Sequence, residues 1–391
     1  MNLKLALCFI LIPFYETAHA QNSITLYGSI DAGVSYVSSS ATATGHSSMV
    51  KFDDGVSQGN RWGLKGSEDL GGGLRAIFDL ENGFTDGNGA LAQGGALFGR
   101  QAWVGLTKQG VGSLTFGRQY SFSTDYLGNN YTLGSLTAAG QYAFHINDVD
   151  QLTSGRINNA VKFSSANFNG LTFGAMYGFS DQAGAFSGSP ATDVDGVKSS
   201  GSSRAYSLGV NYRNGPFGVA VTYTDISYPS VATPAFTTNV ANISTGGTKE
   251  LSTLGAGARY AFGPALIFGN WTNTRFQPII GAQSRLNIFE IGSKYALTSA
   301  FSASLGYTYS KLDDAYEGKW HQVTGVLDYA LSKRTDVYVL AIYQKALGSN
   351  TIDGQNVPVQ AEIGSSTSYL GTSGSGSTSQ VAARIGIRHL F

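Results

Sequence analysis

The sequence ends in SQVAARIGIRHLF (residues 379–391), and this stretch decides the fold. In an extended strand, alternate residues fall on one face, here Val381, Ala383, Ile385, Ile387, His389 and Phe391. The opposite face carries Gln380, Arg384 and Arg388. Chain ends of soluble proteins usually fray. A strand whose apolar row continues to the last residue predicts an end that is held by pairing with a neighbouring strand.

The first twenty residues are typical of an export signal. Lys4 precedes an apolar run of about ten residues, and Ala18-His19-Ala20 forms a cleavage site. We therefore expect residues 1–20 to be removed and residues 21–391 to form one domain. The single cysteine, Cys8, lies in the signal, so the exported chain has no disulfide and no cysteine-based metal site.

Composition narrows the fold class. The 25 basic and 25 acidic residues cancel, which gives no reason to expect a nucleic-acid partner. Glycine (52), tyrosine (21) and phenylalanine (22) are abundant, and no apolar run after the signal is long enough for a membrane-spanning helix. Two all-β classes remain, a secreted sandwich or solenoid and an outer-membrane β-barrel.

Alternation of apolar and polar residues recurs along the whole chain, most clearly at 301–309. Most alternating segments have about ten residues, the length that a tilted strand needs to cross the outer membrane. Their number is even, as in closed single-chain barrels, and the lumen of such a barrel is wide enough to hold water. The sixteen predicted strands are 24–36, 59–67, 73–84, 98–108, 111–119, 156–166, 171–180, 203–213, 217–227, 249–262, 265–276, 285–297, 300–310, 318–330, 336–346 and 380–391.

Short and long connectors take turns between these segments. Short ones include 167–170 and 331–335, and long ones run near 38–58, 85–96, 120–154, 180–202, 228–247 and 347–378. This predicts a 16-stranded antiparallel transmembrane β-barrel with short periplasmic turns and long extracellular loops. In a membrane, all backbone N–H and C=O groups find hydrogen-bond partners only if the last strand pairs with the first. We therefore expect Phe391 to lie near the periplasmic interface, where aromatic rings are favoured.

Six stretches in order along the chain carry a family resemblance: SITLYGSIDAGVSY (23–36), NRWGLKGSEDLGGGLRAIFDLENGF (60–84), GRQAWVGL (99–106), GSLTFGRQY (112–120), LSKRTDVYV (331–339) and IGIRHLF (385–391). They resemble the general porins of Gram-negative outer membranes, particularly the beta-proteobacterial type. The resemblance implies a homotrimer in the outer membrane that passes small hydrophilic solutes by passive diffusion. It also implies an inward-folded third loop, here about 120–154, that constricts the pore. Expected partners are outer-membrane lipids, lipopolysaccharide and the assembly machinery, which would bind the C-terminal strand; no cofactor is expected.

The family pattern also implies an arginine wall at the constriction, carried here by Arg61, Arg100 and Arg156. Alternation supports Arg61, and it places Arg156 with Lys162 on a lumenal face opposite Ile157. The prediction for Arg100 depends on the resemblance alone, because alternation places Arg100 on the same face as apolar residues of its strand. Other charges expected to line the pore are Lys65, Arg75, Lys162, Arg384 and Arg388. Arg75 could equally form an internal salt-bridge ladder with Asp79 and Glu81.

The expected constriction loop lacks the acidic turn that many family members carry. Its acids are Asp125, Asp148 and Asp150, and the last two could either narrow the cation path or tether the loop. A basic wall opposite a nearly neutral loop predicts a moderate preference for anions.

Single residues give little support to other functions. His145 lies near Asp148, but no nucleophile motif accompanies it, so we expect a polar loop residue and no enzyme. No metal site is expected. Two alternatives stay open: a substrate-specific channel, marked by an aromatic track, and a surface adhesin or antigen anchored by a barrel.

Overall fold

The computed structural model describes residues 23–153, 155–179, 192–194, 197–199, 204–227, 248–278, 281–352, 354–363 and 375–391. The expected signal peptide and much of the expected loops at 180–202, 228–247 and 347–378 lie outside these residues. The main sheet consists of β1 (Ser23–Thr42), β2 (Gly45–Asp54), β3 (Arg61–Gly71), β4 (Leu74–Gly83), β5 (Gln101–Lys108), β6 (Gly112–Tyr120), β7 (Arg156–Ser165), β8 (Leu171–Gly178), β11 (Arg204–Asn214), β12 (Phe217–Ser227), β13 (Thr248–Phe262), β14 (Ala265–Pro278), β15 (Ser284–Ala296), β16 (Phe301–Asp314), β17 (Gly318–Ala330), β18 (Thr335–Leu347) and β21 (Ser379–Leu390). Two small hairpins lie outside it, β9 (Thr192–Val194) with β10 (Val197–Ser199), and β19 (Ser349–Ile352) with β20 (Gln355–Pro358).

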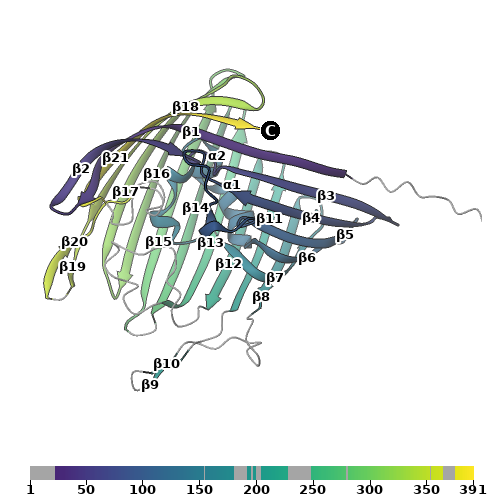
Figure 1. The fold of residues 1–391 in the computed structure, drawn as a ribbon, viewed down its shortest axis with the longest axis horizontal. Helices are drawn as coiled ribbons and strands as arrows, with labels where there is room; N and C mark the ends of the chain where they lie inside the picture. Colours follow the sequence, from purple (N-terminus) through teal and green to yellow (C-terminus); the bar gives the residue numbers. More distant parts are fainter. Residues whose placement is uncertain are drawn as a thin grey trace, which may run out of the picture.

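These strands form a closed antiparallel barrel (Figure 1). Residues 32–42 of β1 pair with β2, and residues 23–29 of β1 pair with β3. β2 and β3 therefore act as one strand, interrupted at 55–60, and the barrel has the sixteen strands predicted from the sequence. The other edge of β1 pairs with β21, which closes the sheet as expected.

The expected long loop at 38–58 is wrong. β1 and β2 continue as a hairpin up to a turn at 43–44. The stretch is rich in Ser and Thr, which resembles loop composition, but Thr also fits the pleated surface of a strand. Here the hydrogen bonds between two consecutive strands stabilise the hairpin, although the apolar alternation is too weak to predict it.

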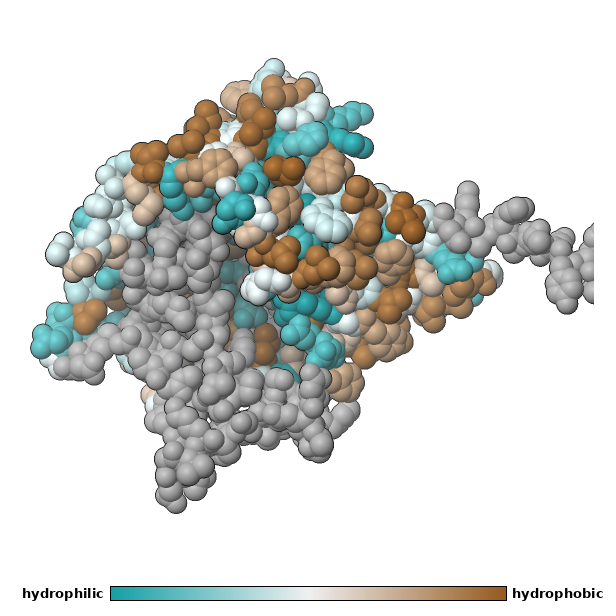
Figure 2. All heavy atoms as spheres, in the orientation of Figure 1, coloured by the Kyte–Doolittle hydropathy of each residue, from teal (hydrophilic) through white to brown (hydrophobic). Residues whose placement is uncertain are grey.

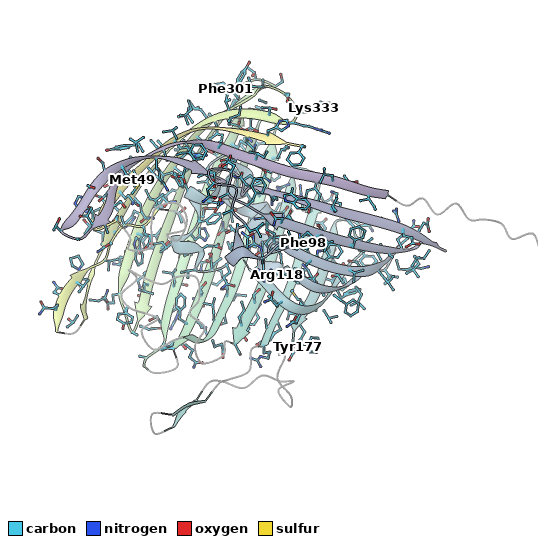
Figure 3. All side chains as sticks on the ribbon, in the orientation of Figure 1. Met49, Phe98, Arg118, Tyr177, Phe301 and Lys333 are labelled. Atoms are coloured by element: carbon cyan, nitrogen blue, oxygen red, sulfur yellow. The ribbon has the colours of Figure 1, made fainter. Side chains whose placement is uncertain are left out.

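The connectors differ between the two ends of the barrel. Turns such as 72–73, 215–216 and 331–334 lie at one end with the chain terminus, here called the short-turn end. Phe301 and Lys333 mark this end, whereas Tyr177 lies toward the opposite, long-loop end (Figure 3). Among the described residues, no helix has the length and hydropathy to cross a membrane.

Alternation decides which side chains face outward. In β16, Leu305 is 60% exposed and Tyr307 39%, whereas Thr308 and Ser310 are buried. The same pattern repeats on other strands, so that large hydrophobic side chains are exposed on the outer surface of the barrel; Figure 2 shows many of them on the face in view. An apolar outer face with polar groups inside is the arrangement that lipid outside and water inside require.

The last residue is held as the sequence predicted. The Phe391 amide donates to the Gly28 carbonyl (3.1 Å), and the Gly28 amide donates to the Phe391 carbonyl (3.0 Å). On the other edge of β21, the Leu390 amide donates to the Arg334 carbonyl (2.8 Å). A Cβ at Gly28 would lie 2.2 Å from the Phe391 ring, so the ring packs where only glycine leaves room.

A buried ion cluster stabilises the seam between β1, β18 and β21. Arg384 Nη2 lies 2.9 Å from Asp31 Oδ1, and both side chains are fully buried. Tyr338 Oη donates to Asp31 (2.9 Å) and accepts from Arg384 Nε (2.8 Å). Arg384 was expected among the charges exposed in the pore; it faces inward but is covered, since Asp31, Tyr338 and Ser35 surround its guanidinium.

We expect Arg384→Met to destabilise the barrel by about 3 kcal/mol, because it leaves the Asp31 carboxylate buried without its charge partner. The temperature at which folded protein unfolds, followed by its altered mobility in denaturing gels, measures the loss. Arg334→Met removes an exposed cation from the short-turn end and serves as the control. Equal unfolding temperatures for the two variants would contradict the role of the cluster.

Candidate pore constriction

The L3 segment (residues 121–155) joins β6 to β7 and folds into the barrel. It contains the short helical elements η2 (Ser123–Gly128), α1 (Asn129–Tyr131), α2 (Leu133–Leu136), η3 (Gly140–Ala143) and η4 (Ile146–Asp148). η2 contacts β11, β12 and β13, and α2 contacts β15. Figure 1 shows α1 and α2 within the outline of the barrel. The expectation that the third loop folds inward is thus confirmed.

Glycines on the inner face of the barrel make room for the L3 segment. A Cβ at Gly257 would lie 2.6 Å from Leu127 Cδ1 and 2.7 Å from Tyr131 Cβ. A Cβ at Gly306 would lie 2.4 Å from Leu133 Cδ2. We call these positions the glycine track, because they follow the path of the L3 segment over successive strands. Its other members, each close to Phe122, Tyr126 or Leu127, are Gly174, Gly209 and Gly255.

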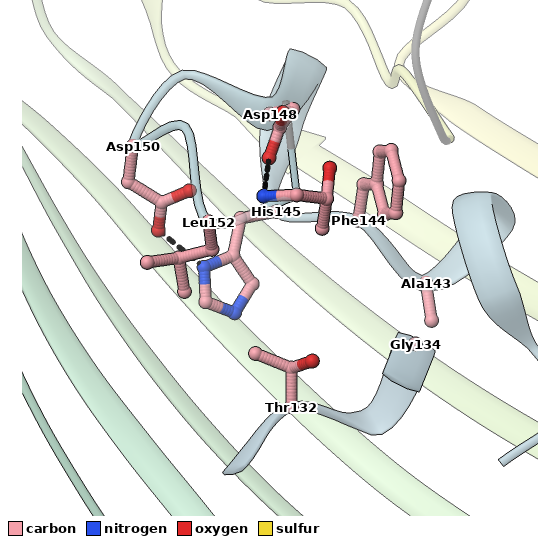
Figure 4. A pocket seen from close by; sticks show the side chains of 9 residues that line it. Thr132, Gly134, Ala143, Phe144, His145, Asp148, Asp150 and Leu152 are labelled. Carbon is pink, nitrogen blue, oxygen red and sulfur yellow. Dashed lines mark hydrogen bonds and ion pairs between the residues drawn. The ribbon is translucent and has the colours of Figure 1, made fainter. Parts of the chain in front are cut away.

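A buried ionic cluster fixes the C-terminal half of the L3 segment to the barrel wall. Figure 4 shows its loop side, where the His145 ring faces the Asp150 carboxylate. His145 Nδ1 lies 2.5 Å from Asp150 Oδ2, and Thr272 Oγ1 of β14 donates to the same oxygen (2.7 Å). On its other side, His145 Nε2 lies 3.5 Å from Glu290 Oε2 of β15. The second oxygen of Glu290 accepts from the Leu133 amide (2.7 Å). The wall therefore binds two separate turns of the loop.

His145 carries a positive charge in this cluster. It belongs to the L3 segment, not to a spanning strand. Burial by itself lowers the pKa of His145, because the charged ring loses hydration, but the Asp150 and Glu290 carboxylates outweigh burial and raise the pKa to about 10. His145 lies in the loop, as expected, but it is buried rather than solvated. His145 is a buried cation that bridges two carboxylates.

The start of the L3 segment is fixed by a second set of contacts. Lys162 of β7 donates to the Asp125 carboxylate and to the Tyr120 carbonyl (2.7 Å). The Phe122 amide donates to Ser207 Oγ (2.9 Å). Lys162 was expected to line the pore; the structure instead places it beneath the loop, where it is buried against Asp125, one of the acids expected in the loop.

Beside the L3 segment lies a cavity of about 760 Å³. Its charged lining consists of four arginines and two aspartates: Arg61, Arg100, Arg156, Arg388, Asp54 and Asp148. The face that the L3 segment presents to it is almost uncharged, with side chains such as Ser135, Thr137 and Gln141. The cavity therefore has a basic wall on one side and a nearly neutral loop on the other.

The structure brings the three arginines of the expected wall together at this cavity. Arg100 Nε donates to Glu81 Oε1 (2.7 Å), which neutralises part of its charge. Arg156 Nη2 donates to Tyr120 Oη (2.8 Å), and its guanidinium stacks 4.8 Å from the centre of that ring. Arg61 forms no ion pair within the part of the chain that the structure describes. Whether these side chains set ion selectivity stays a prediction.

A bulge in β7 changes the faces expected around Arg156. Asn159 has a φ of 51°, and the pairing of β6 with β7 shifts between Gly117 and Gln119. Ile157 consequently faces inward and is buried beside Phe122, contrary to the alternation read from the sequence. A bulge inverts the parity of every residue beyond it.

The remaining predicted charges lie in three different surroundings. Arg388 lines the cavity while its Nη2 pairs with Asp336 (2.8 Å). Lys65 lies 5.0 Å above the Tyr27 ring and is exposed. Arg75 is exposed at the short-turn end, and among the described residues it forms no ladder with acids of β4.

The two loop acids that could narrow the path or tether the loop lie in different surroundings. Asp148 lines the cavity and accepts from the Thr153 amide (3.1 Å). Asp150 is completely buried against His145 and is removed from the path of any solute. Within the described residues, no group of three or more His, Cys, Asp or Glu side chains could hold a metal ion.

The model of one family, the Gram-negative porins, matches residues 16–348. The chain belongs to the Gram-negative porin family. Porins of this family lie in the outer membrane, so the long-loop end is extracellular and the short-turn end periplasmic.

Individual porins agree with this assignment. An outer membrane porin protein of Bordetella pertussis is 35% identical over 237 residues, which span 58% of this chain and 60% of that protein. Outer membrane porin protein 32 of Delftia acidovorans is 29% identical over 96% of this chain and 95% of its own length. The solved structure of an anion-selective porin from Comamonas acidovorans superposes with a TM-score of 0.73 at 25% identity, and covers 95% of this chain and 100% of that one.

Two features of this porin's constriction were missed in the sequence. Glu290 and Thr272 anchor the loop from strands more than a hundred residues away, so no local signal marks them. The glycine track has a signal: glycine is disfavoured in strand interiors unless another group approaches closely. Inward-facing glycines on several strands could therefore have shown where the loop lies.

We expect Gly257→Val to push the L3 segment toward the lumen, because the new side chain would occupy the space of Leu127 and Tyr131. Overpacking of this kind costs about 1–3 kcal/mol, and single-channel conductance should fall. Gly325→Val is the matched control, since a Cβ there meets nothing within 4 Å. Equal conductance in both variants would contradict the packing of the loop on the track.

The His145 cluster predicts a pH dependence above neutrality. Because the pKa of about 10 lies above the ordinary value of 6.5, the stabilisation by His145 is complete below pH 6.5, declines above it and is lost as pH rises through about 10, where the folded protein itself loses the charge. Current fluctuations of the open channel should therefore increase between pH ~8 and ~11. His145→Gln should lose that dependence, whereas His321→Gln, on the outer surface, should keep it. A pH profile unaltered by His145→Gln would refute the assignment.

Proposed function

We propose that this porin forms a water-filled channel for passive diffusion of ions and small hydrophilic solutes, with a moderate preference for anions. The observation that carries the proposal is the basic wall of Arg61, Arg100, Arg156 and Arg388 opposite a nearly uncharged loop. Fixed charges in a narrow opening bias the passage of ions. The bias is moderate, because Glu81 and Asp336 neutralise two of the arginines in part, and water screens the rest over ~8–10 Å.

The proposed transport requires no catalytic step and no cofactor. Solutes would enter at the long-loop end, pass between the L3 segment and the arginine wall, and leave at the short-turn end. The anion selectivity of the related Comamonas porin supports the sign of the preference. Export through a cleaved signal at 1–20 is part of the same proposal.

A substrate-specific channel is less well supported. Such a channel would need an aromatic track along the path of the solute. The aromatic residues that line the described cavity are Phe84 and Phe144, and the remaining lining is mainly small or polar. A barrel that serves only as an anchor has no need for an open cavity beside its loop.

We further infer that the protein assembles as a homotrimer, contacts lipopolysaccharide in the outer leaflet, and is recognised by the assembly machinery through β21. An outer membrane protein of Vibrio cholerae with the same fold, 16% identical and with a TM-score of 0.63, is described in a trimer form. The apolar outer row that runs to Phe391 supports the role of the last strand.

The zero-current potential of the purified protein in a planar bilayer under a KCl gradient tests the charge preference. We expect an anion-directed potential for the native protein and a shift toward cations in the double variant Arg61→Ser, Arg156→Ser. Arg334→Ser, at the short-turn end, leaves the wall intact and should keep the native potential. A cation-directed potential in the native protein would overturn the anion preference, and absence of conductance would overturn the channel.

A further inference from the structure

Tyr27 of β1 joins two carboxylates on the inner face of the barrel. Its hydroxyl donates to Asp79 Oδ1 (2.8 Å) and to Glu81 Oε2 (3.1 Å). Both acids belong to β4, and β3 lies between β1 and β4 in the sheet (Figure 1). Tyr27 has the inward parity of the buried Ser29, whereas Leu26 is exposed on the outer surface. The tyrosine therefore reaches across a whole strand inside the lumen.

A glycine lets the tyrosine ring cross β3. Strand register places Gly63 directly between Tyr27 and Glu81. A Cβ at Gly63 would lie 2.7 Å from Tyr27 Cζ and 2.8 Å from its hydroxyl oxygen, so the ring lies against the backbone of β3. Lys65 of the same strand places its Nζ 5.0 Å from the centre of the ring. These contacts hold the ring in place independently of its hydroxyl.

Both carboxylate oxygens of Glu81 have a partner. Oε1 accepts from Arg100 Nε (2.7 Å), and Oε2 accepts from the Tyr27 hydroxyl. Glu81 is only 4% exposed, although its partner Arg100 lines the cavity beside the L3 segment. Packing and hydrogen bonds of this kind lock the orientation of a side chain. The Tyr27 hydroxyl is thus one of two groups that fix where the Glu81 charge lies.

Arg61 lies within reach of the same carboxylate. Register sets Arg61 opposite Gly83 and Glu81 opposite Gly63, so Arg61 and Glu81 are diagonal neighbours on one face of β3 and β4. Long side chains can meet across such a diagonal. Arg61 nevertheless lines the cavity without an ion pair among the residues that the structure describes. The orientation of Glu81 therefore decides whether the Arg61 charge stays available to solutes.

We propose that Tyr27 is a positioning residue for ion selectivity, because its hydroxyl holds Glu81 against Arg100 and leaves Arg61 unneutralised. This rests on the proposed anion preference of the constriction. Without the hydroxyl, Oε2 of Glu81 would lose its donor in a buried site, and a buried charged acceptor without a partner is costly. Arg61 offers the missing donor. A carboxylate that turns toward Arg61 offsets a second charge of the arginine wall.

The charges on either side of Glu81 favour a turn in that direction. Along β4, Asp79 lies on one side of Glu81 and is opposite Lys65, whereas Arg61 lies toward the other side. Like charges repel, so Glu81 is pushed away from Asp79 once no hydroxyl hydrogen is shared between them. Lys65 lies on the side of Asp79, and its attraction to the aromatic ring does not depend on the hydroxyl. Arg61 is therefore the cation that the released carboxylate approaches.

Zero-current potentials of the purified protein in a planar bilayer under a KCl gradient test this role. We expect Tyr27→Phe to shift the potential toward cations, but by less than the double variant Arg61→Ser, Arg156→Ser, because it neutralises one arginine only in part. Glu81→Gln removes the acid itself and should shift the potential the opposite way, toward anions. The combined variant Tyr27→Phe, Glu81→Gln should match Glu81→Gln alone, because no carboxylate remains to turn.

Tyr295→Phe is the matched control. It removes a tyrosine hydroxyl from the outer surface, where Tyr295 is 49% exposed, and it should keep the native potential. All variants should migrate as folded barrels in gels run without heating, so that each potential is measured on intact pores.

Other outcomes would overturn the proposal. An unchanged potential in Tyr27→Phe would show that Glu81 stays in place without the hydroxyl. A shift toward cations that persists in the combined variant would assign the effect to the shape of the lumen rather than to Glu81. A cation-directed potential in the native protein would overturn the proposed anion preference instead, and the difference between the native protein and Tyr27→Phe would still test the tyrosine.

Discussion

Backbone pairing inside lipid is the constraint on which the rest of the structure depends. A peptide group without a partner costs several kcal/mol in hydrocarbon, so the sheet has to close on itself. The sheet closes at β1, which pairs with β2 and β3 along one edge and with β21 along the other. Gly28 and Phe391 complete it with a reciprocal pair of hydrogen bonds. The chain can therefore end on its last paired residue without fraying.

Closure creates an interior that must be divided between loop and water. On one side, small inward residues such as Gly257 and Gly306 let the L3 segment approach the wall closely. On the other side, long inward residues such as Arg61 and Arg156 reach toward the remaining opening. The size of the opening then depends on how firmly the loop is held. Two charged pairs hold it: His145 with Asp150 is fully buried, whereas in the other pair Lys162 is buried and Asp125 stays partly exposed.

The sequence was sufficient for the features that depend on local order along the chain. A period of two residues in the apolar pattern predicts the strands, and the contrast of short and long connectors predicts which connections lie at each end of the barrel. Features that depend on distant partners were not accessible. Arg384 is buried because Asp31, at the other end of the chain, lies against it. Ile157 faces inward because of a bulge at Asn159, which alternation cannot show.

The alternation that forms the barrel also places some charged side chains inside it and others outside. The zero net charge of the chain does not reveal this division. Arg61 and Arg275 are both strand arginines, yet Arg61 lines the cavity inside the barrel and Arg275 is exposed on its outer surface. A one-residue shift in register would exchange those environments. An inward arginine acts on solutes in water, where its field is screened. An outward one lies at the edge of a low-dielectric layer and needs an anion close by. The net charge of such a protein is therefore uninformative about its charged surfaces. Whether a charged residue occupies an inward or an outward position of its strand indicates whether it faces the lumen or the outer surface.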